Sequence, residues 1–140
     1  MDLVRDAMIT EPRSLPAAAS AQEAGQVLTP VDVRAVYVVD AAGGLVGVVT
    51  RKTLVARVVA TGLEPRATAL GAIAEDPYYT IDADVPLDEA FRLLEEWDAE
   101  RVPVVEEGRL AGVLSRSVLR RRLAEDEDPP EAGVDVAGGS

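Results

Sequence analysis

Two short stretches of the chain place a hydroxyl side chain and a cation directly after an apolar run. They are Thr50-Arg51-Lys52-Thr53 and Ser115-Arg116. A Ser or Thr at such a junction commonly caps a helix, because its oxygen accepts a hydrogen bond from a free backbone N–H. The same N–H groups, at the positive end of the helix, can also bind a phosphate. Both interpretations stay open, and one hydroxyl could serve both; the cations are either solvated charge or phosphate contacts.

The composition excludes several kinds of catalytic site. The chain contains no cysteine and no histidine, which excludes a thiol nucleophile, a disulfide, a Cys/His zinc site and a histidine base. Adjacent acidic pairs such as Glu95 and Glu96 do not converge on one helix face. We therefore predict that the protein is not an enzyme. The lack of cysteine agrees with a reducing cytoplasm, which is the compartment we expect.

The charge of the chain is strongly acidic and unevenly distributed. The formal net charge is −11, so nucleic acid is not an expected partner. The basic run at residues 120–122 lies near an expected helix end, where cations suit the helix dipole. Residues 125–140 contain six acids and no base, and we predict that they form a disordered acidic tail.

No membrane segment is expected. The most apolar stretch, residues 35–49, is interrupted by Asp40 and by Gly43 and Gly44. Each uninterrupted part is far shorter than the roughly 20 residues that a spanning helix needs. The first eight residues contain no apolar signal core.

The strongest feature of the sequence is an internal repeat at a spacing of about 65 residues. AVYVVDAAGGLVGVVTR (residues 35–51) matches RVPVVEEGRLAGVLSR (residues 101–116). Upstream, QEAGQVL matches DEAFRLL and MITEP matches IAEDP, in the same order. We therefore divide the chain into a first repeat at 1–66 and a second at 67–124.

Each repeat is predicted to fold as strand, helix, strand, strand, helix. The first strands are expected at Ser14 and Leu15 and at residues 79–81, and helices at residues 21–28 and 87–97 follow from apolar faces at helical spacing. Valine-rich runs around glycine-containing turns predict two hairpins. Closing helices are expected after Thr50, with a stripe at residues 54, 55, 58 and 59, and at residues 116–123.

The pattern resembles a tandem pair of cystathionine-β-synthase (CBS) domains, a Bateman module. The residues that carry the resemblance are VYVVDAAGGLVGVVTR, VPVVEEGRLAGVLSR and the helix DEAFRLLEE. It implies an α/β (α+β) fold in which two pseudo-symmetric β-α-β-β-α repeats pack sheet to sheet. It also implies a regulatory protein, often a homodimer, that binds an adenosyl ligand such as AMP, ADP or ATP between the repeats and signals to an effector protein outside this chain.

The resemblance also implies which residues line the ligand clefts. Besides the two hydroxyl stretches, these are Tyr37, Tyr79, Thr80, Arg101 and Pro103. Tyr37 either stacks on a base or is a half-buried strand residue. Pro103 cannot donate to a strand ladder, which predicts an edge or a local opening of the sheet.

Both repeats lack one ligand-binding residue of the family pattern. The family's binding stretch ends in an Asp that accepts hydrogen bonds from ribose, and this chain has Thr53 and Val118 there. Thr53 still offers an oxygen, so the cleft at residues 50–53 is the preferred site and that at Ser115 and Arg116 the weaker one. The alternative function is an interaction module that has lost its ligand.

Overall fold

The two valine-rich segments form the predicted antiparallel hairpins. Strands β3 (Val36–Val39) and β4 (Leu45–Val49) pair in the first, and β6 (Arg101–Glu106) and β7 (Arg109–Ser115) in the second. Gly43 and Gly108 in the turns have φ of 87° and 80°, a region that glycine enters without steric cost. The turn chemistry therefore sets the register of each hairpin.

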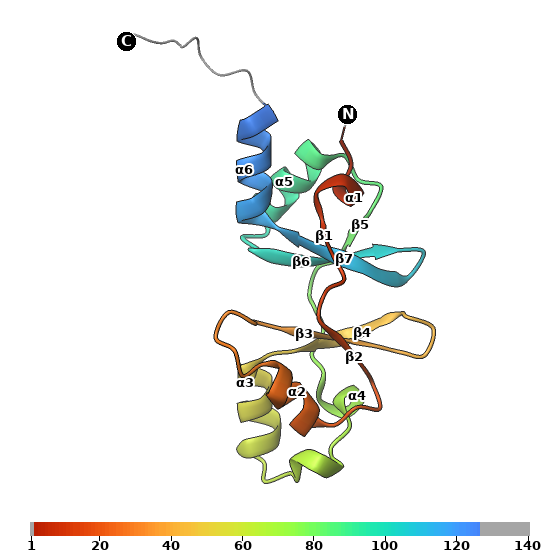
Figure 1. Ribbon diagram of the computed structural model, residues 1–140, viewed down its shortest axis with the longest axis vertical. Coiled ribbons are helices and arrows are strands. Elements are labelled where there is room, and N and C mark those ends of the chain that lie inside the picture. Colours follow the sequence, from red (N-terminus) through yellow and green to blue (C-terminus); the bar gives the residue numbers. More distant parts are fainter. Residues whose placement is uncertain (1, 127–140) are drawn as a thin grey trace.

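Each hairpin belongs to one α/β unit, and the two units stack with their sheets facing each other (Figure 1). The computed structural model describes residues 2–126. The first unit has sheet order β2-β3-β4 and the second β1-β7-β6-β5. The first unit contains β2 (Ser14–Pro16), α2 (Ala21–Val27), α3 (Arg51–Leu54), the π-helical turn η1 (Val55–Val59), the 3-10 turn η2 (Pro65–Ala67) and α4 (Leu70–Ile73). The second contains α1 (Val4–Ala7), β1 (Ile9–Thr10), β5 (Ile81–Asp82), α5 (Leu87–Glu96) and α6 (Arg116–Asp126).

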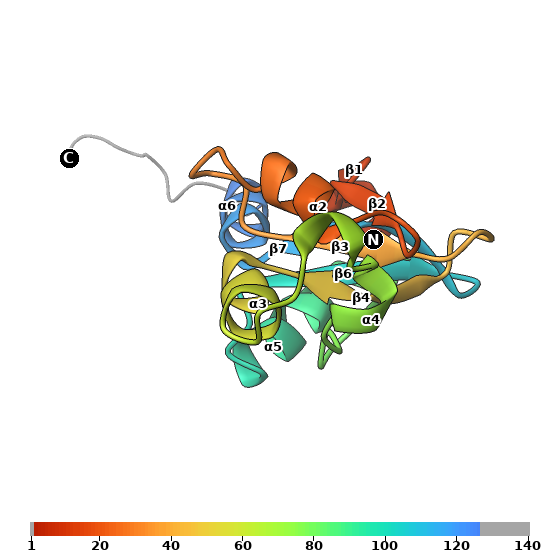
Figure 2. The same ribbon diagram turned by 90° about the horizontal axis from the view of Figure 1, so that it is seen from below.

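Helices cover the outer face of each sheet. Seen from below, α2, α3 and α4 lie over the sheet of the first unit (Figure 2). Helix α2 begins as predicted, because the Ser20 hydroxyl accepts a hydrogen bond from the Glu23 N–H at 3.1 Å. The predicted stripe of α5 faces the core, since Leu87, Ala90 and Leu94 are at most 2% exposed. Within residues 2–126, no helix is both long and apolar enough to span a bilayer.

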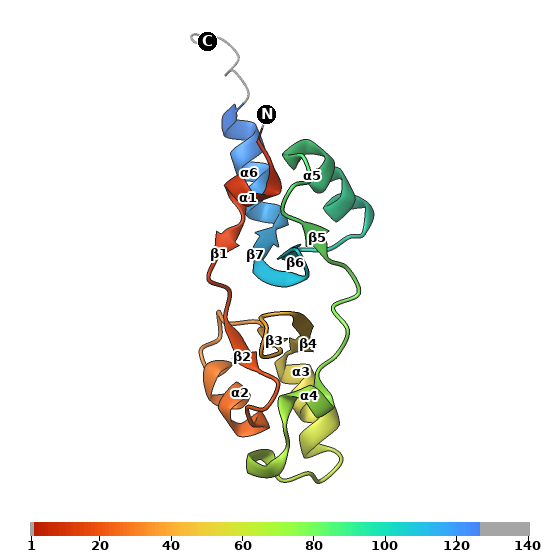
Figure 3. The same ribbon diagram turned by 90° about the vertical axis from the view of Figure 1, so that its right-hand side faces the viewer.

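Each packed unit contains a segment of chain from the other sequence repeat. The N-terminal strand β1 pairs with β7, so the start of the chain completes the second unit. Conversely, Glu75 of the second repeat exchanges two backbone hydrogen bonds with Val48 of β4, at 2.8 and 2.9 Å. The two connecting segments, residues 11–13 and residues 74–80, run between the units on opposite sides (Figure 3). The division at residues 66 and 67 therefore describes the sequence repeat, while each unit in space contains chain from both repeats.

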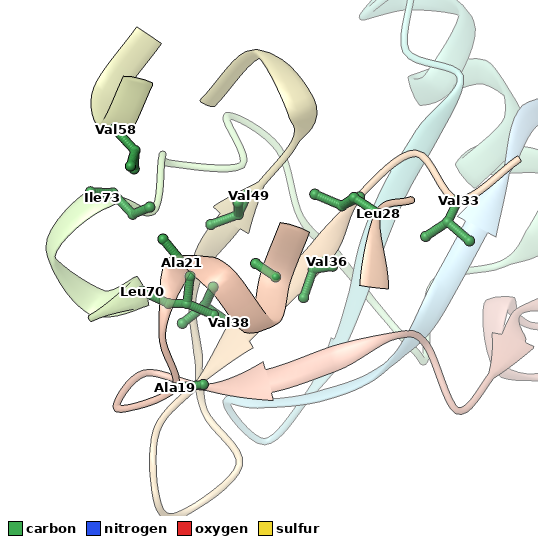
Figure 4. Packing of buried hydrophobic residues seen from close by; sticks show 11 residues of the cluster. Ala19, Ala21, Leu28, Val33, Val36, Val38, Val49, Val58, Leu70 and Ile73 are labelled. Carbon is green, nitrogen blue, oxygen red and sulfur yellow. The ribbon is translucent and has the colours of Figure 1, made fainter. Parts of the chain in front are cut away.

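Each unit has its own aliphatic core. In the first, valines of β3 and β4 pack against α2 and α4, and Leu70 and Ile73 of the second repeat contribute to this cluster (Figure 4). In the second, Val4 from the N-terminus packs with Leu87, Leu94 and the β6–β7 hairpin. The exchange therefore extends from the strand edges into both cores.

Two predicted strand features differ from the structure. Strand β5 contains Ile81 and Asp82, whereas Tyr79 and Thr80 precede it. Strand β6 lies between β7 and β5, so an edge position for Pro103 is wrong. The local opening that was the alternative is present, because pairing with β5 begins only at Val104.

The closing helices also differ from the prediction. Leu54 and Val58 face the core, but Val55 and Val59 are 58% and 70% exposed, because a π-turn rotates this part of the helix. Helix α6 continues to Asp126 instead of ending at Leu123, because Leu, Ala and Glu are good helix formers. Residues 125 and 126, which the sequence assigned to the tail, thus belong to this helix, and the rest of the predicted tail, residues 127–140, lies outside the described residues.

Two glycines, one in β4 and one in β7, leave room for the segments that pair with these strands. A Cβ on Gly47 would lie 2.8 Å from the Glu75 carbonyl oxygen, and one on Gly112 would lie 2.7 Å from that of Ile9. Both obstacles are backbone atoms, which cannot move aside as a flexible side chain could.

We predict that Gly47→Ala and Gly112→Ala each lower the free energy of unfolding by about 1–3 kcal/mol, because each overpacks a strand edge. Gly25→Ala is the control: its nearest neighbour is Leu54 Cδ1 at 3.8 Å, and alanine in a helix interior gains roughly 0.5–1 kcal/mol. Urea unfolding measures all three, and a Gly47→Ala protein as stable as the wild type would contradict the prediction.

Candidate functional site: a cleft between the two units

A cavity of about 440 Å³ opens at the seam between the two units. The first connecting segment contributes residues 11–13 to its lining. The first unit contributes residues 32–35, just before β3, and Tyr37, and the second unit contributes Ile9, Arg101 and Val113. These segments meet because β2 and β3 are parallel, so their beginnings lie at one edge of the sheet. The volume lies within the roughly 300–1,000 Å³ of small-molecule sites.

Tyr37 forms part of the cavity wall. It pairs with Ser14 on one side and Val48 on the other, its N–H donates to the Arg13 carbonyl at 2.9 Å, and it is 7% exposed. Burial raises the pKa of its hydroxyl, and the nearby Arg101 guanidinium opposes that rise. Tyr37 is therefore a buried strand residue, more buried than predicted, that also borders the cavity.

Cations outnumber anions around the cavity. Arg13, Arg34 and Arg101 line it together with Glu11 and Asp32. Among residues 2–126, none of the three arginines forms an ion pair. The lining therefore has a formal charge of +1, with three arginines against two carboxylates.

The first hydroxyl stretch is engaged inside the first unit. Thr50 caps α3: its hydroxyl accepts from the Thr53 N–H at 3.2 Å, and the Thr53 hydroxyl accepts from the Thr50 N–H at 3.0 Å. Thr53 also donates to the Glu75 carboxylate at 2.7 Å and is 1% exposed. The capping interpretation of Thr50 is confirmed, and the oxygen of Thr53 is already hydrogen-bonded to protein groups.

The cations of that stretch do not line the cavity. Arg51 donates from Nη2 to the Pro30 carbonyl at 2.6 Å, and Lys52 is exposed to solvent. This arrangement agrees with the solvated-charge interpretation.

The second hydroxyl stretch lies one ladder position from the cavity. Ser115 pairs with Arg101 across β6 and β7, is 3% exposed, and accepts from the Val118 N–H at 3.4 Å. Arg116 lies 3.4 Å from Asp98 and 3.7 Å from Glu100. Arg116 is thus paired with carboxylates, although its Nε is buried without a hydrogen-bond partner.

Glu100 connects these groups. Its partial desolvation would raise its pKa, but hydrogen bonds from Ser117 and Ser115 and the charge of Arg116 outweigh that effect, and its pKa is lowered. Glu100 therefore stays ionised and holds the start of α6 against the start of β6.

The remaining predicted residues lie outside the cavity. The ring of Tyr79 stacks on Trp97, with centroids 4.4 Å apart and planes 6° from parallel. Thr80 is exposed, and Pro103 is buried in β6 opposite Val113. Of the predicted ligand residues, the cavity brings together Tyr37 and Arg101.

Most of the charged residues that line the cavity were not predicted from the sequence. Arg13 and Arg34 each lie just before a strand, Asp32 two residues earlier, and Glu11 in the first connecting segment. The available signal was that the two strands are parallel, so residues preceding them share an edge. Glu75 was missed as well, because nothing in its local sequence indicates a contact with Thr53.

Comparisons with known proteins agree with this architecture. A family model described as the CBS domain matches residues 4–60 and 70–125. Hypoxic response protein 1 of Mycobacterium tuberculosis is 31% identical over 102 residues, 73% of this chain and 71% of that protein. The crystal structure of Hypoxic Response Protein I with two coordinated zinc ions is 27% identical, with a TM-score of 0.72 over 86% of this chain and 98% of that one. The structure of CBSX2 in complex with AMP is 24% identical, with a TM-score of 0.72 over 89% of this chain and 98% of that one.

We predict that Thr53→Val destabilises the protein by about 1–3 kcal/mol, because it leaves the capped Thr50 N–H without its acceptor in a partly buried site. Thr53→Ser keeps the hydroxyl and is expected to lose much less. Thermal and urea unfolding of the pair measure the difference. Equal stability of the valine and serine variants would show that the hydroxyl has no structural role.

Proposed function

The chain belongs to the CBS domain family, as a tandem pair, and from this premise we propose that it senses an adenine nucleotide or related adenosyl ligand and regulates a partner protein. The observation that carries the proposal is the cavity of about 440 Å³ at the seam, where Tyr37 and the cationic Arg101 lie together. CBSX2, which shares this fold, was crystallised with AMP. Because the ligand would touch both units, its binding would change how they sit against each other in a way that a cytoplasmic effector could recognise.

We now prefer the cavity at Tyr37 and Arg101 as the ligand site. The sequence had favoured the stretch at residues 50–53 instead, because of the oxygen of Thr53. The apolar wall of the cavity at Tyr37 suits a base, and the guanidinium of Arg101 suits a phosphate. Ser115 pairs with Arg101, which lines this cleft, and Arg116 follows at the start of α6, where it could exchange its carboxylate partners for a ligand phosphate. In this proposal, residues 50–53, Tyr79, Thr80 and Pro103 belong to a secondary site. It would lie on the side of the molecule where the second connecting segment, residues 74–80, joins the two units.

The zinc ions of Hypoxic Response Protein I are not carried over to this chain. Zinc sites in proteins are built mainly from Cys and His, and this sequence contains neither.

A second candidate function is an interaction module without a ligand. The specific observation in its favour is that Thr53 and Val118 replace the acidic residue of both binding stretches. In the first stretch, the carboxylate of Glu75 is already bound to Thr53.

Calorimetry separates the two functions. We expect heat of binding from at least one of AMP, ADP, ATP, S-adenosylmethionine, methylthioadenosine, NAD and cyclic dinucleotides. Arg101→Gln should weaken that binding roughly 10- to 100-fold, because it removes a charge-assisted hydrogen bond. Arg92→Gln, an exposed arginine of α5 outside the cavity, is the matched control.

A cap variant and a complete lack of binding test the proposal further. Thr50→Ala should lower stability through the lost cap and leave the affinity of the cavity at Tyr37 and Arg101 unchanged. Silence of the whole panel against a folded protein would reject the sensor and favour the interaction module.

We also propose that the protein is a homodimer that pairs through the helical face of the first unit. Val55, Val59 and Leu63 are 58%, 70% and 47% exposed on this face. Of the three, Val59 also lines a groove of about 320 Å³ between α2 and the closing helix that a partner side chain could enter. The corresponding turn of the second unit carries Arg120 and Arg121, whose like charges would oppose self-pairing there.

We expect the wild type to have twice the monomer mass in light scattering, and Val59→Glu to shift it to the monomer, because the charge would be buried at an apolar contact. Val46→Glu, on the exposed part of the β3–β4 hairpin, should leave the mass unchanged. A wild-type monomer at high concentration, or a dimer that tolerates Val59→Glu, would reject this interface.

A further inference from the structure

Aromatic side chains gather where the second connecting segment meets the end of α5. Tyr78 and Tyr79 belong to the connecting segment, and Trp97 ends α5. The rings of Tyr79 and Trp97 stack with their centroids 4.4 Å apart. The connecting segment and α5 lie on the same side of the molecule (Figure 3). We call Tyr78, Tyr79 and Trp97 the aromatic patch.

The patch is open to solvent. Tyr78 is 89% exposed and Tyr79 is 40% exposed. Tyr78 also has a φ of 58°, in the left-handed region that bulky side chains rarely adopt, and the Tyr79 N–H donates to the Pro77 carbonyl across it. Burial does not explain why a strained turn places a large ring in water, so the turn points to contact with another molecule.

Carboxylates surround the patch. The two segments that carry it, residues 74–80 and 95–100, contain no base and six acids: Glu75, Asp76, Glu95, Glu96, Asp98 and Glu100. Arg116 pairs with two of these acids, and Arg120 pairs with a third. Even when Arg101, the next residue along the chain, is counted with these two arginines, the acids outnumber the cations by three. The patch therefore combines aromatic rings with negative charge.

Aromatic rings and carboxylates have one common partner, the guanidinium group. It stacks on the faces of Trp and Tyr, and its planar fork donates two hydrogen bonds to a carboxylate. The second unit already contains one such arrangement, because Arg120 lies 6.0 Å from the centre of the Phe91 ring and also pairs with Glu95. The excess of carboxylates would repel an acidic partner.

We propose that the aromatic patch is a docking surface for an arginine-bearing segment of a partner protein. The inference names the partner chemistry that the proposed function leaves open, and it requires no ligand in the cavity.

The second connecting segment also joins the patch to the first unit. Glu75 exchanges two backbone hydrogen bonds with Val48, and its carboxylate accepts a hydrogen bond from Thr53. Four residues later, Tyr79 stacks on Trp97 of the second unit. A change in the tilt between the units would therefore move the tyrosines relative to Trp97, and a docked partner would sense that change.

Fluorescence of the full chain tests the docking, because Trp97 is the only tryptophan of the sequence. The probes are capped peptides in which glycine alternates with arginine, lysine or glutamine, added without nucleotide. We expect the arginine peptide to change the Trp97 emission and to bind roughly 3- to 10-fold tighter than the lysine peptide, which has the charge without the planar fork. The glutamine peptide should bind weakest, and added salt should weaken binding of the arginine peptide.

Two variants of Tyr78 separate docking from folding. Tyr78→Gly removes the ring at a φ that glycine adopts freely, so it should weaken binding of the arginine peptide roughly 3- to 10-fold and keep or raise the melting temperature. Tyr78→Phe retains a ring and should bind like the wild type. Val31→Gly is the control, since it removes an 85% exposed apolar side chain from the first unit and should leave binding unchanged.

A second pair of variants tests the carboxylates. Asp98→Asn should weaken binding of the arginine peptide about 2- to 5-fold, as expected for an exposed ion pair. Glu107→Gln carries the same charge change in the turn between β6 and β7 and should have no effect.

Three results would overturn the inference: no change of emission with the arginine peptide up to about 1 mM, equal affinity for the glutamine peptide, or wild-type binding by Tyr78→Gly. If Tyr78→Gly instead converts a wild-type dimer to a monomer in light scattering, the patch binds a second copy of the chain and docking of a partner protein is rejected. None of these measurements includes a nucleotide, so the calorimetry described above decides the sensor function separately.

Discussion

The structure depends on one topological constraint: each unit is completed by chain that the sequence assigns to the other repeat. Strand β1 closes the edge of β7, and Glu75 closes the edge of β4 with two backbone hydrogen bonds. Neither repeat can satisfy its strand edge or fill its core alone, so the two halves must fold together. A single repeat of this length would also be marginal by itself, since small domains bury too little apolar surface.

The same constraint creates the cleft. Because the connecting segments must pass from one unit to the other, they run through the seam and form a wall of it, which places Arg13 beside the start of β3. At the far ends of the hairpins the units are joined directly, since the Leu110 N–H donates to the Gly43 carbonyl at 3.0 Å and the Arg109 guanidinium donates to Ala42 at 2.9 Å. A ligand bound near the starts of β3 and β6 would therefore act at the end of the seam that lies farthest from these hydrogen bonds. Small rearrangements there would tilt one unit on the other.

Local sequence predicted the parts of the fold that local physics determines. The hairpins, the start of α2 after Ser20 and the buried face of α5 all follow from contacts within a few residues, and each prediction is confirmed. The exchange of segments did not follow, because MITEP and IAEDP were recognised as equivalent without any indication of which sheet each would join. The exposure of Val55 and Val59 was missed for a related reason: a π-turn shifts the helical face, and no periodicity rule anticipates it.

The site was predicted less well because motif residues can be retained for structural reasons. Gly47 and Gly112 recur at equivalent positions of the two repeats because each lies where a segment from the other repeat passes too close for a side chain. Thr50 was open to two roles, and its hydrogen bonds serve the helix. The cavity owes part of its charge to Arg13 and Arg34, which lie outside the motif and are brought together by the parallel starts of β2 and β3. The repeat therefore preserves the strands that frame the cavity, whereas the chemistry of the cavity depends on side chains that the repeat leaves free to differ.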